Sequence, residues 1–416
     1  MTTLVLGGGL IGVTSAYYLA KSGREVVVLE RNDGTGDQTS FQNGALLAPG
    51  HSHSWAAPGA PWTLLKSLFE RDPMLTFRPS LDPQFWRWGL RFLANCSERQ
   101  YRENTLRTFR CMNEGLDELR ELCAATGIEY DGNENGILYL FRSEASFAKR
   151  RDDWNLLRDH GLQLEEVDAA RCVEIEPVLG SVREKIGGGF FSPDEAAGDA
   201  WDFTRKLTAY CENMGVEFRY GVSIEGLEAT KRGIACAHTN KGRFVGDDYL
   251  LALGPQAAQI AHTAGVALPI WPVKGYTATL PLSESDLAPQ VGIIDEDNLV
   301  AFAHLGNRFR VGGEAEFAGF DTTYTADRFR KVFAVTRDLF PGVGNFDEAR
   351  LWACLRPVSA GGPPIVGESP IGNLFVNVGH GAAGWTEACA VSRAAADIMT
   401  GRRPDLDMAG LRLRDL

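Results

Sequence analysis

The sequence has no apolar run approaching the roughly 18 consecutive residues that a membrane-spanning helix needs. It also has no cluster of lysine and arginine, and its 54 acidic residues outnumber the 42 basic ones to give a net charge of −12. Nucleic acid is therefore not an expected partner. An apolar strand begins at about Leu4 and leaves no room for a charged leader and cleavage site. We accordingly expect a cytoplasmic location.

Cysteine pairs are missing as well. The eight cysteines are scattered along the chain without a C-x-x-C motif, so neither a metal site nor a disulfide framework is indicated, and we expect reduced, mostly buried thiols. His51 and His53 resemble half of a metal site, but no third ligand follows nearby. We interpret both histidines as loop residues that face a substrate.

The first thirty residues carry the most specific pattern in the chain. An apolar strand, a G-x-G-x-x-G turn, a helix, a second apolar strand and an acidic residue follow one another in the order of a dinucleotide-binding unit. Gly7 permits the tight turn, Gly9 lets the backbone approach a pyrophosphate, and Gly12 lets the helix pack on the strand. Glu30 is placed to accept hydrogen bonds from the ribose of an adenosine. The alternative is a βαβ unit with an empty glycine turn.

A second glycine-rich turn lies at the opposite end of the chain. Residues 379–384 follow a predicted strand over 374–378 and precede a predicted helix over 385–400. The start of this helix would stabilise negative charge, such as that of a reduced flavin near its pyrimidine edge. A nicotinamide enzyme has no need of such a second site. The two turns together therefore favour FAD over NAD.

Arg356, in a Leu-Arg-Pro sequence, lies shortly before the second turn. An arginine delivered beside a flavin can hold a substrate carboxylate through a bidentate pair. The alternative is a structural ion pair. Hydride transfer to a flavin depends on positioning more than on acid–base groups, and no nucleophile–base pair stands out in the sequence.

Several longer strings, in this order and spacing, resemble the D-amino-acid dehydrogenase small-subunit family, within the D-amino-acid oxidase and glycine/sarcosine oxidase superfamily. They span almost the whole chain and are LGGGLIGVTSAYYLAKSGREVVVLER, TSFQNGALLAPG, WAAPG, VKGYTATL, FRVGGEAEFAGF, LRPVSAGGPPIVG and NVGHGAAGWTEACA. The resemblance implies noncovalent FAD and oxidation of an amino acid at its α carbon to an imino acid, which water hydrolyses to a 2-oxo acid and ammonia.

The resemblance also implies a fold. It is an α/β (α+β) chain in which a Rossmann-like FAD-binding domain is interleaved with an antiparallel-sheet substrate domain, as in D-amino-acid oxidase. We expect the FAD-binding domain to comprise residues 1–50, 165–262 and 350–416. The substrate-binding domain would comprise residues 51–164 and 263–349.

Site residues follow from the resemblance position by position. The implied catalytic residues are Arg356 and His380. The implied cofactor-binding residues are Gly7, Gly9, Leu10, Ile11, Gly12, Glu30, Arg31, Ser40, Gln42, Asn43, Gly44, Leu46, Ile224, Gly254, Gly379, His380, Gly381, Gly384, Trp385 and Thr386. The implied substrate-binding residues are Arg356, His51, His53, Tyr276 and His304. The string Lys274-Gly275-Tyr276 matches the family without a physical role that we can assign.

The chain departs from the family at some positions. It has Ala360-Gly361-Gly362 where relatives usually carry an aspartate and a glycine, and no tyrosine follows Asp295-Glu296 where one is common. These differences leave the substrate open to a D-amino acid, a cyclic imino acid such as D-proline or a hydroxyproline, or an N-alkyl amino acid.

Electron acceptor and assembly also remain open in the sequence. Electrons would pass to a quinone or another carrier. One alternative is a glycine/sarcosine-type oxidase that produces hydrogen peroxide, and another is a flavin subunit of a larger amine dehydrogenase complex. A hydroxylating flavoprotein would need a nicotinamide donor site that we do not find. A homo-oligomer is compatible with the sequence. A segment with apolar and basic residues is either a short packed helix or a shallow anchor on the inner face of the membrane; it contains Trp62, Leu64, Leu65, Lys66, Leu68, Phe69 and Arg71.

Overall fold

The glycine turn at the N-terminus lies at the centre of a parallel sheet. The computed structural model describes residues 1–67, 75–78 and 80–415. Its first sheet has six strands in the order β10-β2-β1-β14-β21-β20, all parallel except β20, which runs antiparallel to β21. These strands are β1 (Thr2–Leu6), β2 (Glu25–Leu29), β10 (Glu217–Arg219), β14 (Asp248–Leu251), β20 (Ile365–Glu368) and β21 (Leu374–Val378). Distant segments of the chain thus meet in one sheet.

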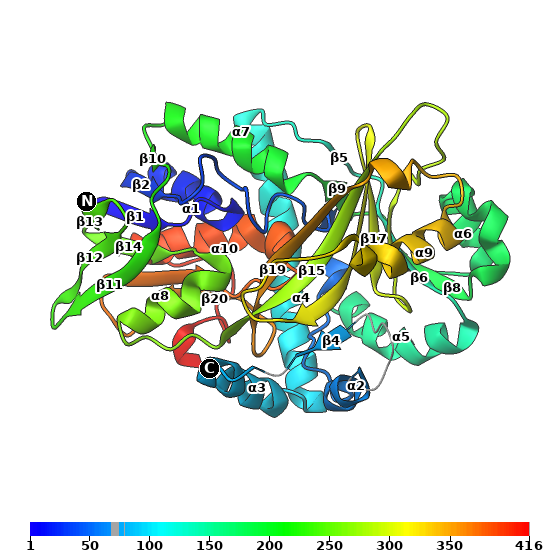
Figure 1. Ribbon diagram of the computed structural model, residues 1–416, viewed down its shortest axis with the longest axis horizontal. Coiled ribbons are helices and arrows are strands. Elements are labelled where there is room, and N and C mark those ends of the chain that lie inside the picture. Colours follow the sequence, from blue (N-terminus) through cyan, green and yellow to red (C-terminus); the bar gives the residue numbers. More distant parts are fainter. Residues whose placement is uncertain (68–74, 79, 416) are drawn as a thin grey trace.

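Helices cover one face of this sheet and a small sheet covers the other (Figure 1). The first face packs against α1 (Leu10–Lys21), α7 (Ala200–Asn213) and α10 (Gly384–Met399). The second face packs against α8 (Ala257–Thr263) and the antiparallel strands β11 (Ile224–Thr230), β12 (Gly233–Thr239) and β13 (Gly242–Phe244). Both faces of the central strands are therefore buried, as expected for parallel strands with continuous apolar runs.

A second sheet lies beside the first, on the right in Figure 1. Its strands follow the order β19-β15-β18-β17-β16-β6-β8-β7, with β4 paired to β18, and most pairs are antiparallel. These strands are β4 (Leu75–Phe77), β6 (Ile137–Phe141), β7 (Glu165–Val167), β8 (Gly188–Ser192), β15 (Ile270–Pro281), β16 (Gly292–Asp295), β17 (Val300–Leu305), β18 (Arg308–Phe317) and β19 (Arg350–Ser359). Helix α9 (Arg330–Leu339) contributes its apolar side to the core on this sheet.

The long helix α4 (Glu98–Thr126) joins the two halves (Figure 1). Ser97 caps its first turn by accepting a hydrogen bond from the Gln100 amide, and Gly127, at φ 69°, ends it. A Cβ on Gly115 would lie 2.2 Å from the Thr386 carbonyl oxygen, so this glycine lets α4 pack directly on the start of α10. This contact holds the first turn of α10, which follows the second glycine-rich turn, against α4.

The remaining elements are short. The other α-helices are α2 (Ala60–Ser67), α3 (Pro83–Ala94), α5 (Glu144–Arg158) and α6 (Ala169–Ile175). A third small sheet contains β3 (Leu46–Leu47), β9 (Ala196–Gly198) and β5 (Gly132–Asn133). The 3-10 turns are η1 (Pro49–His51), η2 (Pro177–Lys185), η3 (Gly254–Gln256), η4 (Ala326–Phe329), η5 (Phe346–Glu348) and η6 (Leu413–Asp415).

The mixed α/β architecture with a Rossmann-like sheet beside a largely antiparallel one confirms the expected fold class. Three strands from the segments expected in the FAD-binding domain, β7, β8 and β19, pair within the second sheet. The chain therefore passes between the two halves more often than the expected boundaries imply, and those boundaries stay a prediction.

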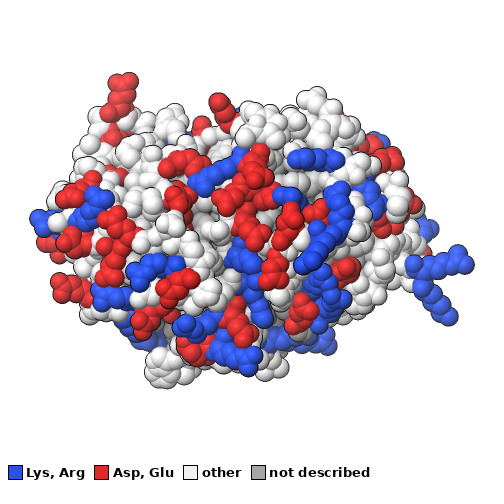
Figure 2. Space-filling view, turned by 180° about the vertical axis from the view of Figure 1, so that it is seen from behind, with Lys and Arg blue, Asp and Glu red and all other residues white. Residues whose placement is uncertain are grey.

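Helix hydrophobicity, surface charge and the cysteines complete the description. No helix in the described part of the chain is both long and apolar enough to cross a membrane. On the face seen in Figure 2, acidic and basic side chains intermingle across the surface. The eight cysteines are unpaired in the structure, and six of them are buried.

Candidate active site

A cavity of about 1000 Å³ lies between the two large sheets. Its wall receives residues from the first glycine turn, the loop 36–46, the second glycine turn, and the strands β15, β18 and β19. Most of the site residues expected from the sequence share this one wall, although they come from both ends of the chain. Those in the wall are Gly7, Gly9, Leu10, Ile11, Glu30, Arg31, Ser40, Asn43, Gly44, Leu46, His51, His53, Ile224, Gly254, Arg356, His380, Gly381, Gly384, Trp385 and Thr386.

The glycines of the first turn have separate roles. Gly7 has a φ of +109°, a conformation that other residues rarely adopt. A Cβ on Gly12 would lie 1.9 Å from the Gly7 carbonyl oxygen, so Gly12 is required for α1 to pack on the turn and is not itself part of the cavity wall. A Cβ on Gly9, in contrast, would meet only Ser40 Oγ, at 3.9 Å. The cavity side of Gly9 is thus the open cradle that a pyrophosphate requires.

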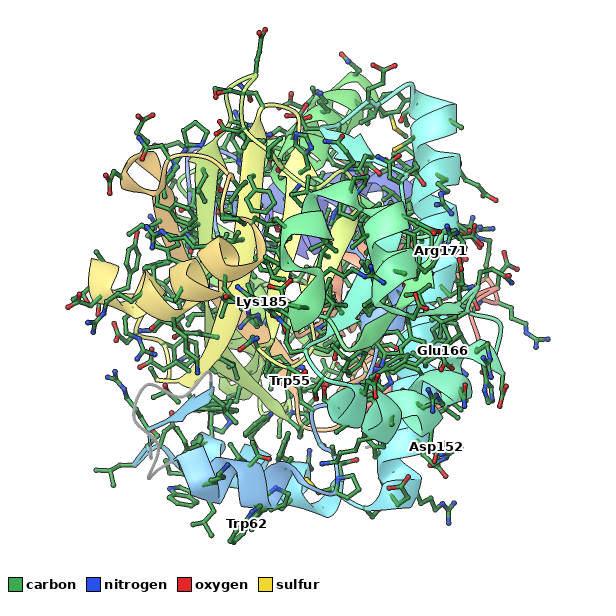
Figure 3. The ribbon with its side chains drawn as sticks, turned by 90° about the vertical axis from the view of Figure 1, so that its right-hand side faces the viewer. Trp55, Trp62, Asp152, Glu166, Arg171 and Lys185 are labelled. Atoms are coloured by element: carbon green, nitrogen blue, oxygen red, sulfur yellow. The ribbon has the colours of Figure 1, made fainter. Side chains whose placement is uncertain are left out.

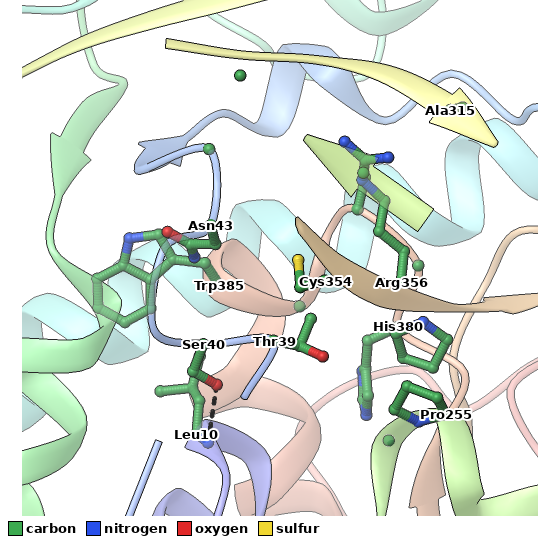
Figure 4. A pocket seen from close by; sticks show the side chains of 18 of the residues that line it. Leu10, Thr39, Ser40, Asn43, Pro255, Ala315, Cys354, Arg356, His380 and Trp385 are labelled. Carbon is green, nitrogen blue, oxygen red and sulfur yellow. Dashed lines mark hydrogen bonds between the residues drawn. The ribbon is translucent and has the colours of Figure 1, made fainter. Parts of the chain in front are cut away.

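Side chains from the neighbouring segments close this end of the site. Ser40 Oγ accepts a hydrogen bond from the Leu10 amide at 3.2 Å (Figure 4). Glu30 accepts hydrogen bonds from the Gly8 amide at 2.7 Å and from the Asn32 amide and side chain at 2.8 and 2.7 Å. Glu30 thereby fixes the turn at the position where the sequence predicts a ribose.

Gln42 supports the loop 36–46 from the side that faces away from the cavity. It is buried and absent from the cavity wall. Thr277 Oγ1 donates to its backbone carbonyl at 2.8 Å, and Thr279 Oγ1 donates to its side chain at 3.2 Å. The structure therefore shows Gln42 anchoring the loop to β15, while Asn43 and Gly44 face the cavity.

The second glycine turn brings another helix start to the cavity. Gly384 begins α10 and lines the wall together with Gly381. The Gly381 amide donates to the Pro357 carbonyl at 2.9 Å, which ties the turn to β19 beside Arg356. Gly379 has a φ of +82° and lies behind the wall, where a Cβ would approach Ser359 Cβ to 3.2 Å.

His380 is the buried polar residue of this turn. Its Nδ1 makes a 2.7 Å hydrogen bond with Glu387 Oε1, whereas its Nε2 has no hydrogen-bond partner among the described residues. Burial raises the pKa of Glu387. An unpartnered buried nitrogen, two helix starts and the empty Cβ positions of Gly9, Gly44 and Gly381 all suit a flavin dinucleotide that spans this cavity.

Arg356 occupies the substrate end of the cavity on β19. Its Nη1 donates to the Glu314 carbonyl at 3.0 Å, and among the described residues no carboxylate forms an ion pair with it. Burial lowers the pKa of the guanidinium. Arg356 is half-buried and faces the cavity, and a cation removed from most of its water without a partner is costly, so this arginine is suited to an anionic ligand. The observation disfavours the structural ion pair that the sequence left open.

A β-bulge and a glycine seat this guanidinium. The pairing of β15 with β18 shifts between Lys274–Glu316 and Tyr276–Gly313, so that two residues of β18 oppose Gly275. Glu314 in the bulge has a φ of +58°, and its carbonyl meets Arg356. A Cβ on Gly275 would lie 2.3 Å from Arg356 Cζ. The glycine of the Lys-Gly-Tyr string thus provides the space for the arginine.

The neighbours of Gly275 point to the opposite face of the sheet. The Tyr276 hydroxyl bonds to Glu316, and Lys274 Nζ lies 3.2 Å from Asp321 Oδ2 and 2.9 Å from the Thr323 carbonyl. Neither Lys274 nor Tyr276 belongs to the cavity wall. The structure therefore does not bring Tyr276 to the expected substrate position, because successive side chains of a strand alternate between faces.

We expect the substitution Gly275→Ala to displace the guanidinium without loss of the cofactor. The added methyl would overlap Arg356, so KM for a carboxylate substrate should rise at least about tenfold, as for one misplaced charge-assisted hydrogen bond. Steady-state kinetics and FAD content would be measured. In an Arg356→Ala background the same substitution should have almost no further effect. Additive losses in the double variant would contradict the proposed seat.

A second set of polar residues, beside Arg356, lines the substrate end of the cavity. His51, on η1, and His53 both lie in the wall with Glu296, Arg150 and Tyr101. Burial lowers the pKa of His51 to about 4 and that of His53 to about 3, so both rings are neutral at pH 7. The His51 side chain is nevertheless 39% exposed, because it faces the cavity and not the outer surface of the protein.

Glu296, Arg150 and Tyr101 are not among the site residues that the sequence predicts. Glu296 lies between Asp295 and Asp297 at the end of β16, where an acidic run resembles an ordinary solvated turn. His304, which the resemblance implied, lies outside the cavity wall, and its Nδ1 faces Gln290 Nε2 at 3.4 Å. Side chains along β17 point alternately to the two faces of the sheet, and the local sequence does not show which of them reach the cavity.

Glu195 holds η1 in place from behind the cavity. Its carboxyl accepts hydrogen bonds from the Tyr139 hydroxyl at 2.6 Å and the Gly50 amide at 2.5 Å, next to His51. Burial raises the pKa of Glu195 to about 8. The folded protein therefore binds this proton more tightly than the unfolded chain, and the contribution of Glu195 to stability falls as pH rises from about 4.5 to about 8.

The substitution Glu195→Gln should remove this pH dependence. A neutral amide can accept from Gly50 and donate to Tyr139 without a charge to bury. We therefore expect the difference in Tm between variant and wild type to move in favour of the variant between about pH 5 and pH 9. Thermal unfolding at several pH values tests this, and a constant difference across the range would contradict it.

Among the described residues, one group of potential metal ligands lies outside the cavity wall, on the β11–β12 hairpin. Ligand atoms of Glu228, Cys236 and His238 lie within 4.8 Å of one another. Arg243 donates to Glu228 at 2.9 Å and to Cys236 Sγ at 3.2 Å, so a guanidinium already engages two of the three.

Comparisons with known proteins agree with this geometry. Over 98% of its length the chain is 43% identical to D-amino acid dehydrogenase from Methylobacterium radiotolerans, 97% of which is covered. It is 41% identical to D-amino acid dehydrogenase 2 from Mesorhizobium japonicum, with 99% of each chain covered. Glycine oxidase from Geobacillus kaustophilus has the same fold, with a TM-score of 0.75, 21% identity, and 99% and 97% coverage.

L-Proline dehydrogenase from P. horikoshii shares the fold to the same degree, with a TM-score of 0.75, 17% identity, and 99% and 96% coverage. The family model described as FAD dependent oxidoreductase matches residues 2–398. The two glycine turns at one cavity and this match over nearly the whole chain agree: the protein belongs to the FAD-dependent oxidoreductase family, and FAD is its cofactor.

Proposed function

We propose that the protein oxidises an amino acid, either a D-amino acid or a related cyclic or N-substituted one, at its α carbon. The single observation that carries this proposal is Arg356, a guanidinium in the wall of the FAD cavity that has no carboxylate partner among the described residues. The relatives at about 40% identity that are named D-amino acid dehydrogenase support the same substrate class.

The residues of this chain position the reactants. Arg356 binds the α-carboxylate through two parallel hydrogen bonds and so fixes the direction of the Cα–H bond. His380, held by Glu387, and the start of α10 support the cofactor ring. FAD, when bound, supplies the acceptor for the hydride that leaves the α carbon. The resulting imine takes up water after the oxidation and yields a 2-oxo acid. The nitrogen leaves as ammonia from a primary amino acid and as an alkylamine from an N-alkyl one, whereas a cyclic imine opens and keeps its nitrogen as an amine in the product.

Anaerobic flavin reduction tests the proposal. The purified protein would be mixed with D-, L-, N-methyl and cyclic amino acids, and the flavin absorbance followed. Bleaching by at least one of them, without a partner chain, supports the proposal and argues against a role as a subunit whose chemistry lies elsewhere. No bleaching by any amino acid would refute it.

For the acceptor we propose a quinone or another carrier in place of oxygen. The cavity has an apolar extension formed by α2, α3 and nearby strands, whose wall includes Leu64, Leu75, Phe92 and Phe317. An apolar passage fits a quinone ring better than a charged carrier. Comparing quinone-analogue reduction with peroxide release under turnover distinguishes this proposal from an oxidase.

A peripheral membrane contact near this passage forms part of the proposal. Trp62 and Leu65 on α2 are 70% and 49% exposed, and Trp62 extends from the lower edge of the molecule in Figure 3. Trp86 and Leu90 on α3 are 54% and 68% exposed, with Arg87 and Arg91 on the same helix. Apolar and basic side chains in this combination suit the surface of an anionic bilayer. Leu68, Phe69 and Arg71, which the sequence added to this segment, lie outside the described residues.

We expect the double substitution Trp62→Ser, Trp86→Ser to reduce cosedimentation with anionic lipid vesicles several-fold, while amino-acid-dependent flavin reduction is unchanged. Substituting Trp352, which packs on Phe41 away from this surface, gives a control for general loss of an aromatic residue. Equal binding by wild type and double variant, or no binding by either, would refute the membrane contact.

A further inference from the structure

Glu296 places an unpartnered carboxyl in the wall of the substrate end. Only 9% of its side chain is exposed, and no described residue donates a hydrogen bond to its carboxyl. The nearest basic group is His51, whose Nδ1 lies 4.0 Å from Glu296 Oε1. Because His51 is neutral, this contact does not neutralise a carboxylate. A buried acceptor that faces a cavity without a donor is one that a ligand can satisfy.

His51 lies close to both the Glu296 carboxyl and Arg356. The charge of Arg356 is one of the causes that lower the pKa of His51, after burial itself. His51 therefore lies within electrostatic reach of Arg356 and beside Glu296, and all three belong to one cavity wall. A ligand whose α-carboxylate binds Arg356 would extend its other end past His51 toward Glu296.

The other charged groups around Glu296 leave it without a partner. Arg150, on α5, lowers the pKa of Glu296, but its Nε lies 3.5 Å from Asp153 Oδ2, so its charge is already shared. Burial is the largest effect, and together with the neighbouring Asp295 and Asp297 it raises the pKa of Glu296 to about 7. At neutral pH the carboxyl is thus divided between a neutral and a charged form, and a donor from a ligand would stabilise the charged one.

We propose that Glu296 binds the substrate's side chain, and that the preferred amino acid carries a hydrogen-bond donor there, either a hydroxyl or a cationic nitrogen. This inference rests on the proposed amino-acid oxidation. It assigns Arg356 to the α-carboxylate of the substrate and Glu296 to the opposite end. Discrimination between substrates then depends on the Glu296 carboxyl, which the sequence Asp295-Glu296-Asp297 does not set apart from the acids on either side.

Matched substrate pairs test the assignment on the FAD-loaded enzyme. D-Lysine and D-norleucine differ by one terminal ammonium, D-homoserine and D-2-aminobutyrate by one hydroxyl, and 4-hydroxy-D-proline and D-proline by one ring hydroxyl. Anaerobic flavin reduction gives a rate and an apparent Kd for each. We expect the donor-bearing member of at least one pair to have a rate/Kd at least about tenfold higher, because losing the donor leaves a buried carboxyl unpaired.

Two variants of Glu296 separate the kinds of donor. Glu296→Gln retains an acceptor but no charge, so it should abolish a preference for ammonium and largely retain one for hydroxyl. Glu296→Met removes the acceptor and should abolish either preference, while reduction by the apolar members continues. Asp327→Asn removes an exposed acid outside the cavity wall and is the control, with the preference of the wild type expected.

The outcomes are distinct. Apolar members that match or exceed their partners in all three pairs, or a preference that survives Glu296→Met, would overturn the assignment and leave the proposed oxidation intact. If no amino acid reduces the flavin of the wild type, the proposed function fails and the assignment fails with it.

Discussion

Replacing Arg356 with alanine should raise KM for the amino-acid substrate by about 30- to 1000-fold. A buried, charge-assisted bidentate pair contributes on the order of 2–4 kcal/mol, and each 1.4 kcal/mol corresponds to roughly a factor of ten. The guanidinium makes one protein hydrogen bond, to the Glu314 carbonyl, and among the described residues it has no carboxylate partner that the substitution would leave unpaired. We therefore expect the loss to fall on the substrate, with FAD content and Tm close to those of the wild type.

Two further variants make this result specific. Arg356→Lys retains the charge but not the planar fork, so its KM should lie between those of wild type and Arg356→Ala. Arg350→Ala removes an exposed arginine from the same strand, outside the cavity wall, and should leave KM unchanged. An unaltered KM in Arg356→Ala, or equal losses in Arg356→Ala and Arg350→Ala, would exclude carboxylate binding by Arg356.

The glycine turns were predictable because their chemistry is local. Gly7 and Gly12 satisfy backbone requirements within a few residues, a positive φ and a close helix approach, and both requirements appear in the sequence as a fixed spacing. The expected first turn, second turn and Arg356 meet at one cavity in the structure. Their convergence follows from the parallel order of β1 and β21 in one sheet, with a helix starting after each strand.

The rest of the site depends on pairing between strands, which the sequence does not specify. The bulge at Glu314 shifts the register of β18 against β15, and that shift determines that Gly275 faces Arg356 while Tyr276 points away. A shift of one residue moves every side chain of a strand to the other face. Glu296 was hidden for a related reason. The acidic run does not show that Asp295 is buried against Arg142, that Asp297 is exposed, and that Glu296 between them faces the cavity.

The second large effect is expected in the first glycine turn, where substitutions of two glycines should impair the protein in different ways. Gly12→Ala would place a methyl 1.9 Å from the Gly7 carbonyl oxygen, so α1 must move away from the turn. Overpacking of this kind costs about 1–3 kcal/mol or more and distorts the pyrophosphate site. We expect a lower Tm for the protein stripped of FAD, together with loss of FAD binding, measured by thermal unfolding and by titration of the flavin fluorescence.

Gly9→Ala should instead leave the fold intact and impair only the cofactor. The backbone of Gly9, at φ −73° and ψ 177°, suits any residue, and its Cβ would meet no atom closer than 3.9 Å. The methyl would occupy the space where the backbone must approach the pyrophosphate, so Kd for FAD should rise at least about tenfold while the FAD-free Tm is unchanged. If both variants lowered the FAD-free Tm equally, or if Gly9→Ala bound FAD as tightly as the wild type, the pyrophosphate would not lie against this turn. The pair therefore separates the glycine that α1 packing requires from the one that the ligand requires.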